Sequence, residues 1–264
     1  MAVMYPVDDY DVHGFVRVAA DFGVDKFGYV VTPNADHLIR FHDELGFRES
    51  YADAAYILLD SQFLSWVFRW TKGIRTRVCT GSDLTSQLLH SAITPNDRIV
   101  LIGGEQQQAD LLINQFGLKC LSHYNPPMGF IRQPEAVEAC LQFVEAHSPF
   151  RFCFLAVGAP QQELLASRLK ARGVARGLAL CIGASINFLT GAERRAPRWM
   201  RRIGMEWLFR LTLNPERLAR RYLVRGPRVF SLIGRTDVKV RPALFNSPVA
   251  TTVLILDPAA ILEN

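Results

Sequence analysis

Short apolar runs of strand-forming residues alternate with amphipathic segments along most of the chain, and this alternation constrains the fold more than any other feature. The expected strands are all short and rich in aliphatic or aromatic side chains; they are Phe27–Val31, Ala55–Leu59, Arg98–Ile102, Phe152–Val157 and Leu178–Ile182. The clearest helical patterns between them are Asp83–His90, Gln106–Phe116, Pro134–His147 and Gln161–Arg172. Such an alternation predicts an α/β fold, with a parallel sheet and helices on both of its faces.

Each expected strand ends in residues that suit a tight turn or a ligand contact. These ends are Thr32-Pro33-Asn34, Asp60-Ser61, Gly103-Gly104, Gly158-Ala159-Pro160 and Gly183-Ala184-Ser185. In open α/β sheets, ligands bind beyond the carboxyl ends of the strands. We therefore expect these strand ends to outline one ligand-binding crevice.

Asp60 ends the most apolar of these strands, and its carboxylate is the candidate general base. A carboxyl group that is half-desolvated at a crevice holds its proton more tightly, which suits proton abstraction from a hydroxyl. The alternative is that Asp60 caps the helix expected over Ser61–Trp70. The spacing alone favours neither interpretation.

Two strand-to-helix turns offer groups for a phosphate or a sugar. Gly81-Ser82-Asp83 precedes an apolar helical pattern and suits a helix start that cradles a phosphate, while an ordinary N-cap explains the same residues at least as well. Gln161-Gln162-Glu163 follows Gly-Ala-Pro at a second turn. Its amides and acid fit sugar hydroxyls, and the alternative is a solvated helix start.

Several common catalytic motifs are missing from the sequence. The absent Gly-x-Gly-x-x-Gly fingerprint opposes a nicotinamide oxidoreductase, and no Walker A loop or serine-nucleophile elbow is present. Asp9 and Asp11 have the D-x-D spacing of a metal site, but helix capping before an expected helix from about Val12 is the better interpretation. The six histidines form no ligand cluster. We expect a site with no metal and no cofactor.

Residues 194–228 form a strongly basic segment. Eleven arginines against Glu206 and Glu216 give it a net charge of +9, whereas the whole chain carries only +5. Apolar side chains recur at helical spacing, and Asn214-Pro215 and Gly226-Pro227 break the pattern. An amphipathic helix of this kind suits an anionic membrane surface, the phosphates of a nucleic acid or a sugar nucleotide. The alternative is a stripe that packs on the core while the arginines face water.

The alternation of strands and helices stops after Gly191, which sets the expected domain boundary. We predict an α/β catalytic unit over residues 1–193 and a basic helical appendage over residues 194–264 that docks on a membrane and closes the site. No apolar run approaches the roughly 20 residues that span a bilayer. The N-terminus lacks the pattern of a signal peptide, and the five cysteines have no paired spacing, so we expect a cytoplasmic protein with reduced thiols.

Several motifs, taken in order, resemble those of the WecG/TagA/CpsF family of bacterial glycosyltransferases over roughly residues 25–230. They are Thr32-Pro33-Asn34, Gly81-Ser82-Asp83-Leu84, Gly103-Gly104, Gly158-Ala159-Pro160-Gln161-Gln162-Glu163, Ile182-Gly183-Ala184, Phe188-Leu189-Thr190-Gly191, Arg195-Ala196-Pro197-Arg198-Trp199-Met200 and Gly204-Met205-Glu206-Trp207-Leu208. The Gly-Ala-Pro-x-Gln-Glu and Arg-Ala-Pro-x-Trp-Met runs are the most specific of them.

The resemblance implies a Rossmann-like domain with a basic C-terminal appendage that closes the site at the inner face of the cell membrane. It implies inverting transfer of a sugar from a UDP-sugar onto a sugar carried by undecaprenyl diphosphate, in cell-surface polysaccharide synthesis. N-acetylmannosamine, its uronic acid and glucose are the sugars that the resemblance suggests. The family's proposed base is the aspartate that ends a strand, which matches Asp60.

The strand ends, the basic segment and the resemblance together give the expected ligand contacts. They are Thr32, Asn34, Ser82, Gly103, Gly104, Gly158, Pro160, Gln161, Gln162, Glu163, Gly183, Asn187, Arg194, Arg195 and Arg198. Three positions depart from the family pattern, since Ser61, Gln161 and Asn187 stand where Gly, Lys and Asp are usual. These departures bear on the identity of the donor sugar more than on the reaction class.

Two other classes of function compete with a transferase. A nucleic-acid-binding protein would use the arginine helices, but their aromatic residues lie among aliphatic ones rather than beside polar base-reading residues, so we expect no nucleic acid partner. A non-catalytic membrane scaffold leaves the polar residues at successive strand ends without a reason. We therefore predict a peripheral membrane glycosyltransferase.

Overall fold

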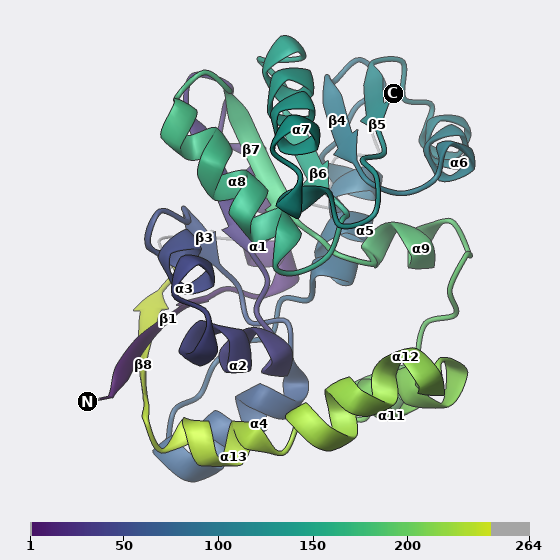
Figure 1. Cartoon of the computed structure of the whole chain (residues 1–264). Coiled ribbons are helices and arrows are strands. Elements are labelled where there is room, and N and C mark those ends of the chain that lie inside the picture. The colour runs from purple at the N-terminus through teal and green to yellow at the C-terminus, as the bar shows by residue number, and fades with distance from the viewer. Residues whose placement is uncertain (1, 244–264) are drawn as a thin grey trace, which may run out of the picture.

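The structure, a computed structural model, describes residues 2–243 and contains eight strands in this range. They are β1 (Val3–Asp9), β2 (Phe27–Val31), β3 (Tyr56–Ile57), β4 (Ile99–Ile102), β5 (Leu121–Tyr124), β6 (Phe152–Leu155), β7 (Gly177–Cys181) and β8 (Thr236–Pro242). Six of them form a central sheet in the order β3-β2-β7-β6-β4-β5, and all neighbours are parallel (Figure 1). A second, two-stranded parallel sheet pairs β1 with β8.

Helical elements connect the strands and continue beyond β7. They are α1 (Val12–Ala20), α2 (Ala35–Asp43), α3 (Leu45–Ala52), α4 (Gln62–Lys72), α5 (Gly81–Ser91), α6 (Gln106–Phe116), η1 (Phe130–Arg132), α7 (Pro134–Ala146), α8 (Gln161–Arg172), α9 (Ser185–Leu189), α10 (Arg198–Arg202), α11 (Glu206–Leu213), α12 (Pro215–Ala219), the π-helical η2 (Arg220–Arg225) and α13 (Arg228–Ile233).

The central sheet separates two hydrophobic core layers because successive strand residues point to opposite faces. In β7, Ala179 and Cys181 belong to the layer built with α2, α3, α7 and α8. Leu178 and Leu180 belong to the other layer, which is built with α1, α5, α6 and α9. Both faces are covered, so the central strands are apolar throughout. The predicted Rossmann-like α/β fold is confirmed.

The predicted strands and helices all occur, with small shifts at their ends. Gln106–Phe116 and Gln161–Arg172 are helices with the predicted bounds. The sequence analysis missed β1, β5 and β8. Their residues are half-polar: β8 alternates charged with apolar side chains, and β1 contains Pro6 and two aspartates. Such strands lack the continuous apolar run that marks a buried central strand.

Strand β3 is only two residues long, shorter than the predicted Ala55–Leu59. The reason is that β1 takes over part of its backbone pairing. Asp8 forms an isolated parallel bridge with Leu58, and the Asp8 carboxylate accepts a hydrogen bond of 2.6 Å from the backbone N–H of Ile57. The polypeptide therefore leaves the sheet early and carries the following Asp60 toward the C-terminal helices.

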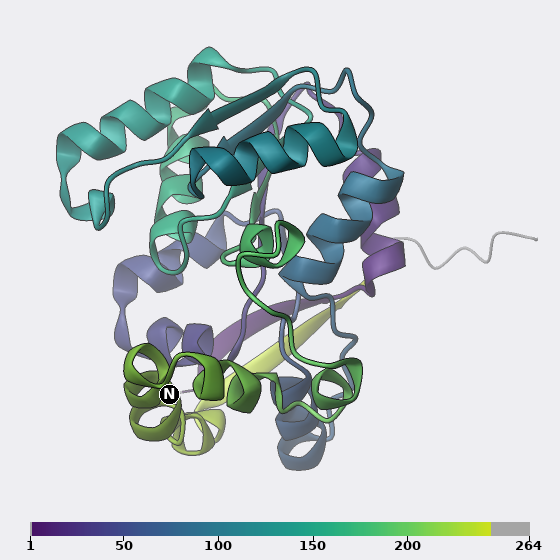
Figure 2. The same ribbon diagram turned by 90° about the vertical axis from the view of Figure 1, so that its right-hand side faces the viewer.

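The basic segment forms a group of short helices at one end of the molecule. Figures 1 and 2 show α11, α12 and α13 below the central sheet, with α13 beside α4, and β8 then returns along β1. The predicted break at Asn214-Pro215 is confirmed, but a further break at Gly204, with φ of +63°, separates α10 from α11. None of the helices in the described part is long and apolar enough to cross a membrane.

The predicted division at residue 193 into two units stays a prediction. Strand β8 lies in the tail of the appendage predicted as helical over residues 194–264, and it pairs with the N-terminal β1. The remaining part of that tail, residues 244–264, lies outside the described residues.

Candidate functional site

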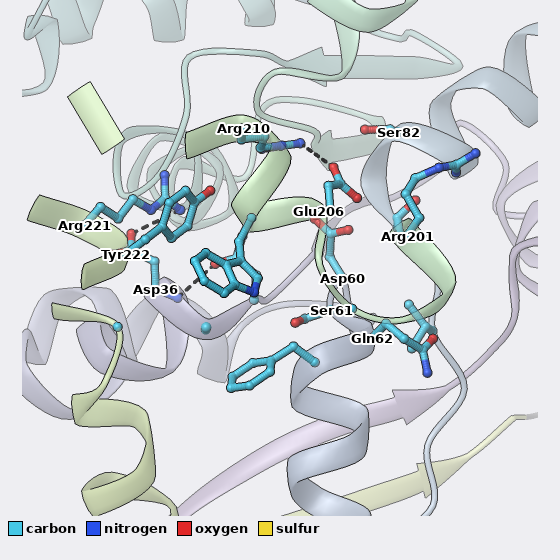
Figure 3. Close-up of a pocket in the computed structure, with 18 of the residues that line it drawn as sticks. Asp36, Asp60, Ser61, Gln62, Ser82, Arg201, Glu206, Arg210, Arg221 and Tyr222 are labelled. Atoms are coloured by element: carbon cyan, nitrogen blue, oxygen red, sulfur yellow. Dashed lines mark hydrogen bonds and ion pairs between the residues drawn. The ribbon is translucent and has the colours of Figure 1, made fainter. Parts of the chain in front are cut away.

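A cavity of about 660 Å³ lies between the α/β core and the C-terminal helices. Its core side is formed by α2, by the start of α4 after β3 and by the start of α5. Its other side is formed by α10, α11, η2 and α13. A single carboxylate at the end of a strand, Asp60, therefore faces a wall that carries several arginines (Figure 3).

The backbone hydrogen bonds around Asp60 are made without its carboxylate, so this side chain can face the cavity. Its own N–H donates to the Pro33 carbonyl at 2.8 Å, which ties the end of β3 to the end of β2. Ser61, and not Asp60, is the N-cap of α4, because its hydroxyl accepts a hydrogen bond from the N–H of Leu64 at 3.2 Å. The capping alternative for Asp60 is therefore wrong, and the carboxylate stays available for chemistry.

The surroundings of Asp60 make its carboxyl group an unusually strong base. Desolvation, and after it the nearby carboxylate of Glu206, raise the pKa of Asp60 from 3.8 to about 8, while Arg210 and Arg195 act in the opposite direction. The side chain is only partly accessible and reaches solvent through the cavity. A base with a pKa close to the working pH is well suited to general base catalysis.

Glu206 and Arg210 bring an ion pair from α11 to the cavity wall above Asp60. Arg210 Nη2 lies 2.9 Å from Glu206 Oε1, and the Arg210 guanidinium also lies over the ring of Phe188, 4.9 Å from its centroid. Figure 3 shows Glu206 between Arg210 and Asp60. The first turn of α11 therefore places a second carboxylate beside the candidate base.

A second set of ion pairs joins the start of α5 to the basic segment. Asp83 accepts a hydrogen bond of 2.7 Å from Arg195, and a longer contact of 3.4 Å from Arg201. Thr80 is the N-cap of α5 and also donates its hydroxyl to Asp83 at 2.7 Å. Arg195, which the sequence analysis placed among the ligand contacts, thus joins the basic segment to the core.

The opposite wall of the cavity contains a third contact between core and segment. Asp36 of α2 lies 3.0 Å from Arg40 and 3.5 Å from Arg221 of η2, and the two arginines lower the pKa of Asp36 against the effect of its burial. Trp207 and Tyr222 also line this part of the cavity, with ring centroids 6.0 Å apart. A planar aromatic pair beside a guanidinium can hold a sugar ring and a phosphate together.

Three predicted ligand contacts on the core side lie at or next to this cavity. Asn34 lines it and caps α2 through its side-chain oxygen, at 3.0 Å from the N–H of Asp36. Ser82 lines it from the first turn of α5. Thr32 is buried behind these residues and donates its hydroxyl to the carbonyl of Cys181 at 2.9 Å, which ties β2 to β7.

The predicted glycine contacts lie farther along the same sheet edge. Gly103, Gly104, Gly158 and Gly183 all have positive φ, which places backbone turns at the ends of β4, β6 and β7. The ends of β3 and β4 are four strand spacings apart, which corresponds to roughly 19 Å. The cavity at Asp60 is lined by none of these glycines, so a single crevice along all the strand ends stays a prediction.

Gln108 holds the loop that joins this glycine end to the basic segment. Its amide nitrogen donates to Asn187 Oδ1 at 3.0 Å and to Thr190 Oγ1 at 3.1 Å, and its oxygen accepts from the N–H of Glu105 at 2.9 Å. Asn187, a predicted ligand contact, also donates to Glu193 at 3.3 Å. Asn187 is thus part of the loop scaffold, a role that the sequence did not indicate.

The predicted ligand contacts in the turn after β6 and at the start of α8 differ in their exposure to solvent. Pro160 and Gln161 are partly exposed, whereas Gln162 and Glu163 are buried. Gln162 accepts a hydrogen bond from the N–H of Gly183 at 2.9 Å and donates to Glu163 at 2.7 Å. Burial raises the pKa of Glu163 to about 7. Gln162 therefore fixes the end of β7, and a direct sugar contact for either residue stays a prediction.

Of the remaining predicted arginines, Arg198 lines the cavity and Arg194 is exposed before it. The sequence analysis did not name Asp36, Arg210, Arg221 or Tyr222 as site residues, and it named Asp83 only as part of the Gly81-Ser82-Asp83 motif. The only available signal was Glu206, one of two acids in a segment of eleven arginines. Among residues 2–243 there is no cluster of three or more His, Cys, Asp or Glu side chains that could hold a metal ion. The Asp9–Asp11 pair instead serves the backbone, because Asp11 caps α1 and Asp9 accepts the N–H of Arg77.

The comparison with protein families identifies a family for this chain. The model described as the glycosyl transferase WecG/TagA/CpsF family matches residues 2–242, which is nearly the whole chain. The match includes β1 and β8, the two strands that lie outside the motifs of the sequence analysis.

Proposed function

The chain belongs to the WecG/TagA/CpsF family of glycosyltransferases, and from this premise we propose that it moves a sugar from a UDP-sugar to a sugar carried on a polyprenyl diphosphate, with inversion at the anomeric carbon. The family makes it a glycosyltransferase of cell-surface polysaccharide synthesis. Membership opposes the nucleic-acid-binding and scaffold alternatives. The observation that carries the proposal is the desolvated carboxylate of Asp60, which faces an arginine-bearing wall across one cavity.

In this proposal the donor lies along the sheet edge and the acceptor enters the cavity. The positive-φ glycines at the ends of β4, β6 and β7 allow close approach of a nucleotide to the backbone. The eleven-residue helix α5 begins at the cavity with Ser82 in its first turn, so its N-terminus favours a diphosphate. The anomeric carbon then lies between this helix start and Asp60.

Asp60 acts as the general base of the transfer. Its ionised carboxylate accepts the proton of the acceptor hydroxyl while that oxygen forms a bond to the anomeric carbon, and the bond from this carbon to the UDP oxygen breaks on the opposite face. A single displacement of this kind inverts the anomeric configuration. The pKa of Asp60 in the protein without substrate is about 8, so the carboxyl group must lose its proton before the reaction.

Arginines stabilise the charge that develops on the leaving UDP. Arg198 and Arg201 line the cavity near the start of α5, and Arg195 lies beside them on Asp83. Guanidinium groups bind phosphates in a bidentate manner and need no metal to do so. We expect turnover to persist after extensive dialysis against EDTA, and a strict requirement for Mg²⁺ or Mn²⁺ would contradict this assignment.

The C-terminal helices also provide the proposed contact with the inner face of the cell membrane. Exposed apolar side chains gather on α4 and on the helices after residue 197; they are Trp70, Trp199, Ile203, Leu213, Leu223, Val224 and Phe230. Several arginines of the same helices turn instead to core acids, such as Arg201 to Asp83 and Arg221 to Asp36. This arrangement favours docking by apolar insertion, assisted by the exposed arginines.

The test is a transfer assay with the full-length protein. A panel of UDP-sugars is incubated with short-chain polyprenyl-diphosphate sugars, the lipid product is measured by mass spectrometry, and its anomeric configuration is determined by NMR. Asp60→Asn should lower kcat by about 10²–10⁴-fold and leave UDP affinity nearly unchanged. The exposed Asp53→Asn is the matched control, and near-normal turnover of Asp60→Asn would show that the base lies elsewhere.

A further inference from the structure

Glu206 stands out among the cavity residues because it is an acid in a basic segment and faces another acid. Its carboxylate belongs to the first turn of α11, whereas Asp60 lies between β3 and α4, 146 positions earlier in the chain. Figure 3 shows the two side chains next to each other, and among charged groups Glu206 is the strongest influence on the Asp60 carboxyl. Like charges at such a position oppose each other's ionisation, so their closeness requires a reason.

An ordinary helix-stabilising role explains part of the position of Glu206. An acid in the first turn of a helix is favourable, and Glu206 forms an i,i+4 pair with Arg210. This role needs only a solvent-exposed helix face, however. Here the pair lines the cavity, and Arg210 Nε is buried without a hydrogen-bond partner among the described residues. A purely structural pair gains nothing from that burial.

We propose that Glu206 is a positioning residue for the transfer, which raises the affinity of Asp60 for the acceptor proton when the C-terminal helices are seated on the core. The inference rests on the proposed function, since it assigns Glu206 to the base of that reaction. Arg210 holds the Glu206 carboxylate in place at 2.9 Å and limits the repulsion between the two acids. Burial has the largest effect on the Asp60 carboxyl, and the negative charge that α11 supplies acts in the same direction.

The other charged or titratable groups near Asp60 do not replace Glu206 in this role. Those that act on it come from three elements; they are Arg210 of α11, Arg195 before α10 and Asp83 of α5, with the buried thiol of Cys79 beside them. Asp83 is already neutralised by Arg195 and Arg201, and its pKa is lowered. Arg210 and Arg195 favour ionised Asp60 and so weaken it as a base. Glu206 is thus the acid best placed to strengthen it.

The proposal predicts opposite effects for two neighbouring substitutions. Glu206→Gln removes a negative charge and should move the acidic limb of the kcat/KM–pH profile to lower pH, by on the order of one unit. Arg210→Gln removes a positive charge and should move the limb to higher pH. Misfolding or a displaced helix would affect both variants in the same direction, so the opposite signs separate electrostatics from structural damage. Glu216→Gln, an exposed acid of α12, is the matched control and should leave the limb in place.

A direct titration makes the result independent of turnover. The ¹³C resonance of the Asp60 carboxyl group, assigned with Asp60→Asn in protein labelled at its aspartates, reports its protonation in wild type and in both variants. Opposite shifts of this titration, together with no transfer from any donor, would refute the proposed function and keep the pairing of Glu206 with Asp60. Transfer activity with an unmoved Asp60 titration in Glu206→Gln would overturn the inference and keep the proposed function.

Discussion

Membrane binding through apolar side chains is the most demanding prediction, because the basic charge of residues 194–228 suggests electrostatics instead. The perturbation is Leu213→Ser with Val224→Ser, at two exposed positions of the C-terminal helices that do not line the cavity. Leu213 is 46% exposed and Val224 is 68% exposed. The matched control is Leu111→Ser with Val174→Ser, at 49% and 55% exposure on α6 and after α8.

The magnitude follows from the exposed fractions of the two side chains. Full burial of a Leu or Val side chain stabilises by about 1.5–3 kcal/mol, so the exposed parts of these two can contribute roughly 2–3 kcal/mol on insertion into the interface. Each 1.4 kcal/mol corresponds to about a tenfold change in the partition coefficient. The double variant should therefore bind vesicles about 30- to 140-fold more weakly than wild type.

The assay is co-sedimentation with vesicles that contain anionic lipid, at low and at high salt. The apolar loss should persist at high salt, whereas Arg202→Ser with Arg220→Ser, at two exposed arginines, should weaken binding mainly at low salt. If Leu213→Ser/Val224→Ser binds as tightly as wild type at both salt concentrations, this surface does not enter the membrane. An equal loss in the Leu111/Val174 control would show a general solubility effect.

Three further outcomes follow from individual contacts. Since kcat/KM reports the free enzyme and Asp60 must be ionised, activity should rise about tenfold from pH 7 to pH 9 through the pKa of about 8; a flat profile in this range would contradict Asp60 as the base. Gly177→Ala should lower the free energy of unfolding by at least about 3 kcal/mol in denaturant titration, because a Cβ would meet a backbone oxygen at 2.0 Å at a φ of +121°, whereas Gly46→Ala has open space and should be neutral or stabilising. Asp83→Asn should release Arg195 and increase protease cleavage in α10–α12 by a few-fold, and unchanged cleavage would show that this contact does not hold the segment.

The fold was predictable because its information is local. The central strands of an α/β sheet are apolar on both faces, and the helices between them carry one apolar stripe, so each element can be recognised within a few residues. The polar edge strands gave no such signal. Strands β1 and β8 pair with each other from opposite ends of the described chain, and no local sequence pattern indicates such a distant pairing.

The candidate site was predictable only in part, because the contacts between distant residues have no local sequence pattern. The position of Asp60 at a strand end could be predicted, but the rejection of its capping role needed the hydroxyl of Ser61 on Leu64. The partners of Asp60 lie on a helix whose position is set by tertiary contacts. Gln162 illustrates the reverse case, since a motif residue that suits a ligand contact proves to hold the backbone of Gly183.

The basic segment shows why a charge count alone does not predict which surface a protein presents. The whole chain has a net charge of +5 and the segment one of +9, so the rest of the chain carries −4. Some acids of this remaining part form ion pairs with arginines of the segment. Asp43, for example, accepts a bidentate contact from Arg228 at 2.8 and 2.9 Å. Because these arginines pair with acids of the core, apolar side chains make up part of the exposed surface of the segment. In the cavity, carboxylates hold the arginines at positions where a diphosphate could replace those carboxylates. Under the proposed function, the same segment would bind the diphosphate of the acceptor in the cavity and the apolar surface of the membrane outside it.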